Sequence, residues 1–314
     1  MNGPALAAIA AQLVVTVAGA PLLVGLMRQV RARLEGRAGA GVGQPWRDLR
    51  KLLRRPPVTP RGTGWAFRLA PLLLVGSALV LAAIAPLVTV ASPLDALADL
   101  FAVVGLLALG TVTLALAALD TGTAFGGMGA SREITVLALV EPTILVAGFA
   151  LSARVGSTNL AAIVTATLHD PLRVASPASL LAAAALLIVV IAETGRLPVD
   201  NPDTHLELTM IHEAMILEYA GSDLALVELA AAMRLTIMLG LLASLFVPWG
   251  IAGASLVALP LAVVIFVAKV AALGAGLGAV EVFVAKLRLF RVPELLAGSF
   301  VLALLAVASS FFLA

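Results

Sequence analysis

The chain has 314 residues, of which 61% are hydrophobic and only 12% are charged, and its mean hydropathy is +1.10. Soluble domains carry about half apolar and about a quarter charged residues, so this composition excludes an ordinary soluble protein. Twenty Lys and Arg nearly balance 18 Asp and Glu, and there is no cysteine. The side chains of this protein therefore form neither a disulfide nor a thiolate-bound metal centre, and any redox metal has to lie on a partner.

Uncharged apolar runs of near 20 residues predict membrane-spanning helices, because a helix of that length crosses about 30 Å of hydrocarbon with its backbone groups paired. The first run lacks a preceding basic region and is expected to be retained rather than cleaved as a signal peptide. The fifth is short, and an amphipathic or re-entrant segment is its alternative. The eight runs are 4–27, 69–90, 100–119, 134–153, 179–192, 224–247, 251–276 and 295–314.

We therefore expect an all-α integral membrane protein, with one membrane domain over residues 1–314 and a bundle of about eight transmembrane helices. Eight spans place both termini on one side of the membrane. Of the 20 Lys and Arg, 16 fall in the connecting segments on the other side, ten of them within 28–64, and only Arg154 and Arg173 lie on the side of the termini. The positive-inside rule makes the basic side cytoplasmic and both termini extracytoplasmic.

The basic cytoplasmic loop over 28–64 contains an amphipathic pattern after Pro45. Trp46 and three leucines share one side of a predicted short helix, and basic residues occupy the other. Such a helix lies on a membrane surface or beneath a docked partner, and binding of anionic lipid is the simpler alternative.

Four charged residues fall inside predicted spans, where an ionised side chain costs several kcal/mol and is expected to face a partner, a cavity or water. Glu141 precedes Pro142, which removes a backbone donor where the helix can bend. Its simpler interpretation is a neutral, hydrogen-bonded acid at a helix contact. Glu228 and Arg234 are six residues apart on opposite faces of one helix, so we expect different partners for them. Lys269 is mid-span, where we expect an interior pairing.

The segment 193–223 holds the densest set of ionisable residues, with seven acids, one arginine and two histidines. We expect an acidic cytoplasmic loop followed by an amphipathic helix over roughly His205 to Tyr219. A solvated helix would explain the acids alone, but the apolar residues among them predict partial burial. Carboxyl groups that lie close together in a low dielectric exchange protons near neutral pH. His205 and His212 lack an evident third ligand, so no metal site is expected.

Three sequence blocks are similar to the membrane subunit that respiratory complex I shares with the energy-conserving membrane-bound nickel–iron hydrogenases. They are RLEGRAGAGVGQPWRDLRKL at 33–52, SREI at 131–134 leading to VEP at 140–142, and ETGRLPVDNP at 193–202 continuing to EYAG at 218–221. A weaker fourth block is KLRLFRVPEL at 286–295. Together with the eight spans, these blocks cover nearly the whole chain.

The resemblance implies a membrane anchor for a hydrophilic redox arm and a chain of buried carboxylates that begins a proton pathway. The acids that match the family, together with two charged residues inside spans, give the expected pathway of Glu141, Glu193, Asp200, Asp203, Glu207, Glu218, Glu228 and Lys269. The arginines expected to face the docked partner are Arg33, Arg37, Arg132, Arg196 and Arg291.

Departures from the complex I pattern favour one branch of this family. Complex I members usually have Phe where Val199 stands and an acid where His205 stands, and NPDTHLELTMIHEAM at 201–215 instead resembles the formate hydrogenlyase and group 4 hydrogenase branch. The resemblance then implies that electrons end at protons on a nickel–iron centre in a neighbouring subunit, which weakens the case for a quinone site.

The leading hypothesis is a non-catalytic, proton-coupling subunit of a hydrogenase-type oxidoreductase complex. It has no catalytic, cofactor-binding or metal-binding residue of its own, and the nickel–iron centre and iron–sulfur clusters lie on partners. Those partners are hydrogenase-like large and small subunits, antiporter-like membrane subunits and lipids, without nucleic acid, in a bacterial or archaeal plasma membrane. The alternatives are a quinone-site subunit of an NADH–quinone oxidoreductase and a stand-alone ion transporter.

Overall fold

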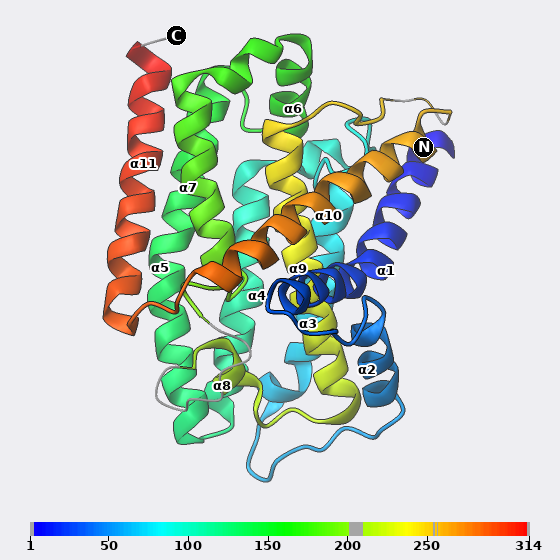
Figure 1. The fold of residues 1–314 in the computed structure, drawn as a ribbon, viewed down its shortest axis with the longest axis vertical. Coiled ribbons are helices and arrows are strands. Elements are labelled where there is room, and N and C mark those ends of the chain that lie inside the picture. The colour runs from blue at the N-terminus through cyan, green and yellow to red at the C-terminus, as the bar shows by residue number, and fades with distance from the viewer. Residues whose placement is uncertain (1–2, 201–209, 254, 256, 313–314) are drawn as a thin grey trace.

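The computed structural model describes residues 3–200, 210–253, 255 and 257–312, which form an α-helical bundle (Figure 1). The longer helices are α1 (Gly3–Leu34), α3 (Trp65–Ile84), α4 (Leu100–Asp120), α5 (Ala124–Ala153), α7 (Pro177–Glu193), α9 (Gly221–Phe246), α10 (Leu259–Phe283) and α11 (Val292–Phe312). The shorter helices are α2 (Gln44–Leu53), α6 (Leu160–His169) and α8 (His212–Ile216), with 3₁₀ turns η1 (Asp95–Leu97), η2 (Pro171–Ala175) and η3 (Leu289–Arg291).

Seven helices within the described ranges are long and apolar enough to cross a membrane, judged by length and composition. They correspond to seven of the eight predicted runs. The remaining run coincides with α7, an apolar helix of 17 residues that is shorter than the other seven. The integral-membrane character and the all-helical class are thus confirmed, whereas the count of eight stays a prediction.

Some helix boundaries differ from the predicted runs. α10 begins at Leu259 rather than 251, because the intervening segment folds back and exchanges backbone hydrogen bonds between Ala252 and the chain near Val88. α5 begins at Ala124, ten residues before the predicted start, because Thr123 caps it by accepting a hydrogen bond from the backbone N–H of Gly126. It then continues through Pro142 without a break.

The helices pack around α9, which contacts α1, α3, α7 and α10 and is the most buried of the long helices. α5, α7 and α11 form a second group that pack against one another, and α10 crosses the bundle obliquely to pack mainly on α1 (Figure 1). α1 begins and α11 ends at the same end of the bundle, which we call the terminal end. α2 and α8 lie at the opposite end, which we call the α2/α8 end.

The helix expected over roughly His205 to Tyr219 is wrong for the part of that segment that the structure describes. Between 210 and 219, only His212–Ile216 is helical. Asp200 explains this short helix, because its carboxylate accepts hydrogen bonds from the backbone N–H groups of Ile211 and His212 and so fixes where α8 begins. The residues 201–209, with Asp203, His205 and Glu207, lie outside the described part of the chain.

The amphipathic helix expected after Pro45 is confirmed as α2. Leu49 is buried and the Trp46 indole N–H donates to the carbonyl of Ala18 in α1, 3.0 Å away. A side chain at Gly25 would collide with the carbonyl oxygen of Val42, so this glycine allows the chain before α2 to lie against α1. The basic loop predicted from residue 28 therefore starts with the last two turns of α1.

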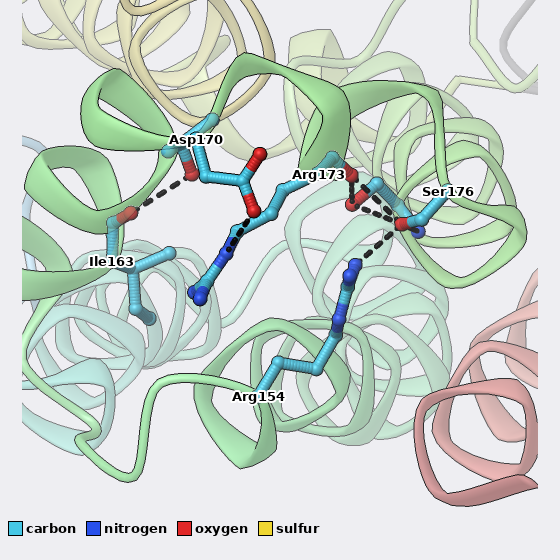
Figure 2. Close-up of polar contacts among 7 residues, drawn as sticks. Arg154, Ile163, Asp170, Arg173 and Ser176 are labelled. Atoms are coloured by element: carbon cyan, nitrogen blue, oxygen red, sulfur yellow. Dashed lines mark hydrogen bonds and ion pairs between the residues drawn. The ribbon is translucent and has the colours of Figure 1, made fainter. Parts of the chain in front are cut away.

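The terminal end holds the two arginines that the predicted topology places there, and both are tied into local contacts (Figure 2). Arg173 pairs with Asp170 at 3.2 Å, and Arg154, at the end of α5, donates to the Ser176 hydroxyl, which caps α7. These contacts join the ends of α5 and α7 through the unpredicted helix α6 and the turn η2.

Gln12 is a buried amide in α1 that holds the end of α3. Its NH₂ group donates to the carbonyls of Ala82 and Ala85 at 2.6 and 2.8 Å, and its oxygen accepts from the N–H of Val88 at 2.9 Å. A buried backbone group that loses its partner costs about 1–3 kcal/mol. The Ala85 carbonyl also accepts from the N–H of Leu87, so the Ala82 carbonyl and the Val88 N–H depend most on this side chain.

We expect Gln12→Leu to lower the free energy of unfolding by about 2 kcal/mol or more, because it leaves these three backbone groups without the amide. Thermal unfolding in mild detergent measures the change as a lower Tm. Gln44→Leu, at the partly exposed start of α2, is the matched control and should shift the Tm far less. Equal shifts for the two variants would contradict the role assigned to Gln12.

Candidate functional site

A cavity of about 200 Å³ lies between α1, α3, α4 and α9 and is lined at the α2/α8 end by α2, α8 and the chain after α7. One wall is apolar, with leucines from α3 and α4. The other gathers ionisable side chains from seven parts of the chain: Arg28, Asp48, Glu133, Glu193, Arg196, Asp200, His212, Glu213, Glu228 and Arg234. Apolar helices and a charged interior coexist because these groups face one another rather than lipid.

Glu193 and Arg234 form an ion pair that joins the end of α7 to the middle of α9, and the Glu193 side chain is only 3% exposed. The Arg234 guanidinium also donates to the Leu107 carbonyl at 2.9 Å and to the Thr111 hydroxyl at 2.5 Å, both on α4. A side chain at Gly110 would lie 3.3 Å from the guanidinium, so the glycine leaves room for it. Three helices thus meet at one arginine.

Two acids of α5 approach the same arginine. Glu133 lines the cavity, and both Glu133 and Glu141 lie within electrostatic range of Arg234. One carboxyl oxygen of Glu141, Oε1, is buried and has no hydrogen-bond partner among the described residues, and neither does Nε of Arg234. Glu133 is absent from the predicted pathway because the fourth run begins at 134, although the SREI block contains it.

A second, much smaller cavity lies between Glu133, Glu193, Asp200 and His212. Its volume is about 10 Å³, close to the roughly 10–15 Å³ that one water molecule needs. A water there has several polar partners within reach. The acids of α5 and α7 are therefore connected to the chain after α7 by a polar space rather than by packed apolar atoms.

Asp200 is a predicted pathway acid whose carboxylate also holds other segments of the chain together. Oδ1 accepts from the Lys286 ammonium at 2.7 Å, and Oδ2 accepts from the backbone N–H groups of Ile211 and His212 at 3.3 and 3.2 Å. The backbone N–H of Leu287 also donates to the Pro198 carbonyl at 2.9 Å. The chain after α7 is thereby fixed to α8 and to the segment between α10 and α11.

Glu281 is a buried acid of α10 that the sequence reasoning missed. Its carboxylate, 2% exposed, lies between Arg31 of α1 and Arg196 of the chain after α7, at 3.6 and 3.7 Å. The seventh run was predicted to end at 276, which left Glu281 in a connecting segment. Its apolar neighbours on both sides in the sequence, Val280 and Val282, are the signal that α10 continues past it.

The remaining predicted pathway residues are more dispersed. Glu228 lines the cavity within electrostatic range of Arg28. Glu218 lies partly buried in the turn after α8. Lys269 lies on α10, and its ammonium donates to the carbonyls of Val247 and Trp249 in the exposed segment after α9, so its partners are backbone groups near the surface rather than an interior side chain.

The arginines expected to dock a partner divide into two groups. Arg33, Arg37 and Arg291 are exposed. Arg132 instead donates to the Met210 carbonyl at 2.7 Å, and Arg196 pairs with Glu281 with only 12% of its side chain exposed. The last two hold the chain after α7 in place.

Burial shifts the pKa of three groups outside the long apolar helices. It lowers the pKa of His212 below its usual 6.5, with a smaller opposing effect of Asp200, and it lowers the pKa of Arg196 against the field of Glu281. It raises the pKa of Tyr219, whose hydroxyl donates to the Phe67 carbonyl at 2.9 Å while its ring stacks on that phenylalanine. In the described ranges, no group of three His, Cys, Asp or Glu side chains is placed to hold a metal ion.

Comparison with known proteins matches nearly the whole chain. The model of the NADH dehydrogenase family matches residues 6–312. Formate hydrogenlyase subunit 4 of Escherichia coli (strain K12) is 37% identical over 303 residues, which are 95% of this chain and 96% of that protein. Hydrogenase-4 component C of the same organism is 37% identical over 244 residues, 76% of this chain and 75% of that protein.

Among solved structures, a chain of the membrane-bound sulfane sulfur reductase, an archaeal respiratory membrane complex, has the same fold. The TM-score is 0.83 with 19% sequence identity, and the alignment covers 98% of this chain and 99% of that chain.

We expect acid to destabilise the protein partly through His212. Because its pKa is lower in the folded protein than the usual 6.5, the unfolded chain binds the proton more readily, and stability present above pH 6.5 is lost as the pH falls below it, by up to about 1.4 kcal/mol per pH unit. His212→Gln should therefore flatten the fall in Tm between pH 7 and pH 5. The control is His169→Gln, an exposed histidine at the terminal end. Parallel Tm curves for wild type and His212→Gln would rule the effect out.

Proposed function

The chain belongs to the NADH dehydrogenase family, and we propose that within it this protein is the membrane-anchor and proton-coupling subunit of a hydrogenase-type, formate hydrogenlyase-like oxidoreductase complex. Its relatives are named as a formate hydrogenlyase subunit and a hydrogenase-4 component, and the first is matched over almost its full length. That coverage supports a role for the whole chain rather than for a shared fragment.

The single observation that carries the proposal is the ionisable cluster inside an apolar bundle. Glu193, Arg234 and Glu133 meet beside a cavity at the α2/α8 end, and Glu141 continues the acids about two turns further along α5. Charged groups in a membrane domain are retained where they serve an ion pathway. In the proposed function, redox chemistry on a docked module changes the charge near the cavity, and these carboxyl groups respond by exchanging protons.

The proposed topology has eight spans, with α7 as the eighth, and the α2/α8 end in the cytoplasm. α7 supports this because it packs against both α5 and α11, which also pack on each other, despite its 17 residues. The common position of the start of α1 and the end of α11 fits an even number of spans (Figure 1). In this orientation both termini are extracytoplasmic and the basic segments face the cytoplasm, in a bacterial or archaeal plasma membrane.

The proposed docking surface for the soluble arm is the α2/α8 end of the protein. It carries the basic loop over 28–64 and the described parts of the acidic segment, 193–200 and 210–223, so a partner bound there lies next to the cavity. Its exposed arginines include Arg33, Arg37, Arg47, Arg50 and Arg291. The partners are hydrogenase-like large and small subunits that hold the nickel–iron centre and iron–sulfur clusters, with antiporter-like subunits beside this protein in the membrane.

Quinone reduction at the cavity is the second candidate, because the cavity combines a leucine-lined wall from α3 and α4 with polar groups opposite. Quinone-site inhibitors distinguish the two. They should block turnover of a quinone-reducing complex and leave hydrogen evolution by a hydrogenase-type complex unchanged.

Mild-detergent purification through a tag on this chain should yield a nickel-containing complex that evolves hydrogen. Arg33→Glu with Arg37→Glu should reduce the recovered soluble subunits by about tenfold or more, because reversing two interface charges adds like-charge repulsion. Arg173→Glu, at the terminal end, is the matched control and should recover the complex normally. Purification of the chain alone, or with subunits that lack nickel, would refute the hydrogenase assignment.

Replacing the acids of the proposed pathway, Glu141 and Glu193, by glutamine should separate turnover from proton movement. In proteoliposomes that contain the whole complex, we expect Glu141→Gln to lower proton movement per hydrogen by about tenfold, which corresponds to about 1.4 kcal/mol, while the complex still assembles. Glu193→Gln should act in the same direction. Glu294→Gln, an exposed acid at the start of α11, is the control. Unchanged proton movement in both relay variants would exclude the pathway.

A further inference from the structure

Arg234 is the feature of the cluster that the predicted pathway does not use. Its guanidinium lies between α4, α7 and α9, pairs with Glu193, and has Glu133 and Glu141 of α5 within electrostatic range. One cation therefore faces three carboxyl groups. How many of the three are ionised together depends on whether another cation serves any of them.

The other charged groups around the cavity have partners of their own. Asp200 pairs with Lys286, and Arg196 with Glu281. Glu281 also holds Arg31 from α1. In these pairs, the charges of the chain after α7 are neutralised by charges on α10 and on the segment that follows it.

The groups from the remaining elements leave Arg234 with the same three acids. Glu228 of α9 lies within electrostatic range of Arg28 in α1 and Asp48 in α2. His212 of α8 is neutral near pH 7, because burial lowers its pKa. Glu213, beside it on α8, lines the cavity and has a partner of its own. Among the residues that the structure describes, Arg234 is therefore the cation that Glu133, Glu141 and Glu193 share.

A buried carboxylate without a compensating charge is strongly unfavourable, and the acid takes up a proton instead. With one shared cation, one of the three carboxyl groups is ionised and the other two carry protons. We propose that Arg234 is a positioning residue that keeps a single negative charge in this cluster and passes it between Glu193 on α7 and the acids of α5. This inference rests on the proposed function and adds Arg234 as the group that links Glu193 on α7 to the acids of α5.

The geometry allows the negative charge to lie on either side of Arg234. The Nη2 edge of Arg234 faces Glu193, whereas its Nε, buried and without a partner among the described residues, is free to donate elsewhere. Glu141 has the complementary atom, a buried Oε1 that accepts no hydrogen bond from any described residue. Arg234 and Glu133 line the adjacent cavity, which has room for several water molecules, so water there can accept from the Arg234 Nε and extend toward Glu141.

The proton balance of one step is simple. A proton enters from the α2/α8 end and binds Oε1 of Glu193, which breaks its ion pair with Arg234. The guanidinium keeps its own proton and its positive charge. An acid of α5 then releases its proton to cavity water and becomes the new counter-ion, so one proton enters, one leaves, and the net charge of the cluster is unchanged.

Infrared spectroscopy of the intact complex tests this directly, because protonated carboxyl groups absorb apart from carboxylates. Glu193→Gln imitates a protonated Glu193, so we expect the acid band to lose the equivalent of one carboxyl group as an α5 acid ionises. Arg234→Gln should do the opposite and add one protonated group. The double variant should return the band to the wild-type intensity, and Arg234→Lys, which keeps the charge, should leave it there.

Arg173→Gln, which removes a partly exposed arginine at the terminal end, is the matched control and should not change the band. Glu133→Gln and Glu141→Gln, each combined with Glu193→Gln, should remove the remaining protonated group as well, because the one acid that is left becomes the counter-ion of Arg234. An acid band that is the same in wild type and Glu193→Gln would overturn the proposal. Should Arg234→Gln fail to assemble, Glu193→Gln and Arg234→Lys still decide, because both keep the cation.

The infrared result is independent of the proposed function. A complex that lacks nickel or moves no protons would refute the hydrogenase-type coupling role, yet the acid band would still report how Arg234 distributes the charge. Conversely, lost coupling in Glu141→Gln with an unchanged band in Glu193→Gln would remove the shared-cation mechanism and leave the coupling role in place.

Discussion

The ion pair between Glu193 and Arg234 is the constraint around which the membrane domain is organised. Its charges lie where the surrounding helices are apolar, so each is stable only with the other present and with further polar contacts. The Leu107 carbonyl and the Thr111 hydroxyl of α4 supply those contacts, and Gly110 supplies the space. The positions of α4, α7 and α9 are therefore determined by electrostatics as much as by packing.

The α2/α8 end encloses this pair with segments that have little regular structure. α8 is five residues long, and its start is set by the carboxylate of Asp200, which Lys286 holds from the other side. The chain after α7 is further held by the pair of Arg196 and Glu281. A short network of charges thus adds to the hydrophobic packing of Ile211, Met215 and Ile216 at this end of the bundle.

Hydropathy located the long helices because each needs a continuous apolar run, whatever its neighbours. It placed their ends less well, since Glu133 and Glu281 interrupt the apolar pattern although α5 and α10 continue past them. The two acids are tolerated because Arg234 and Arg31 come from other helices, and sequence spacing does not reveal such partners. The helix expected from His205 failed for a similar reason, because a distant carboxylate sets the start of α8.

Because α10 crosses the bundle obliquely, the contacts of Glu281 near one end affect the position of the whole helix. The 25-residue helix is roughly 37 Å long, is gripped near one end by two arginines, and elsewhere rests mainly on α1 (Figure 1). A swing of about 5° about that grip displaces the far tip by about 3 Å over such a length. The contacts of Glu281 with Arg31 and Arg196 therefore fix the angle at which this helix crosses the bundle, and the length of the helix multiplies any change in that angle at its other end.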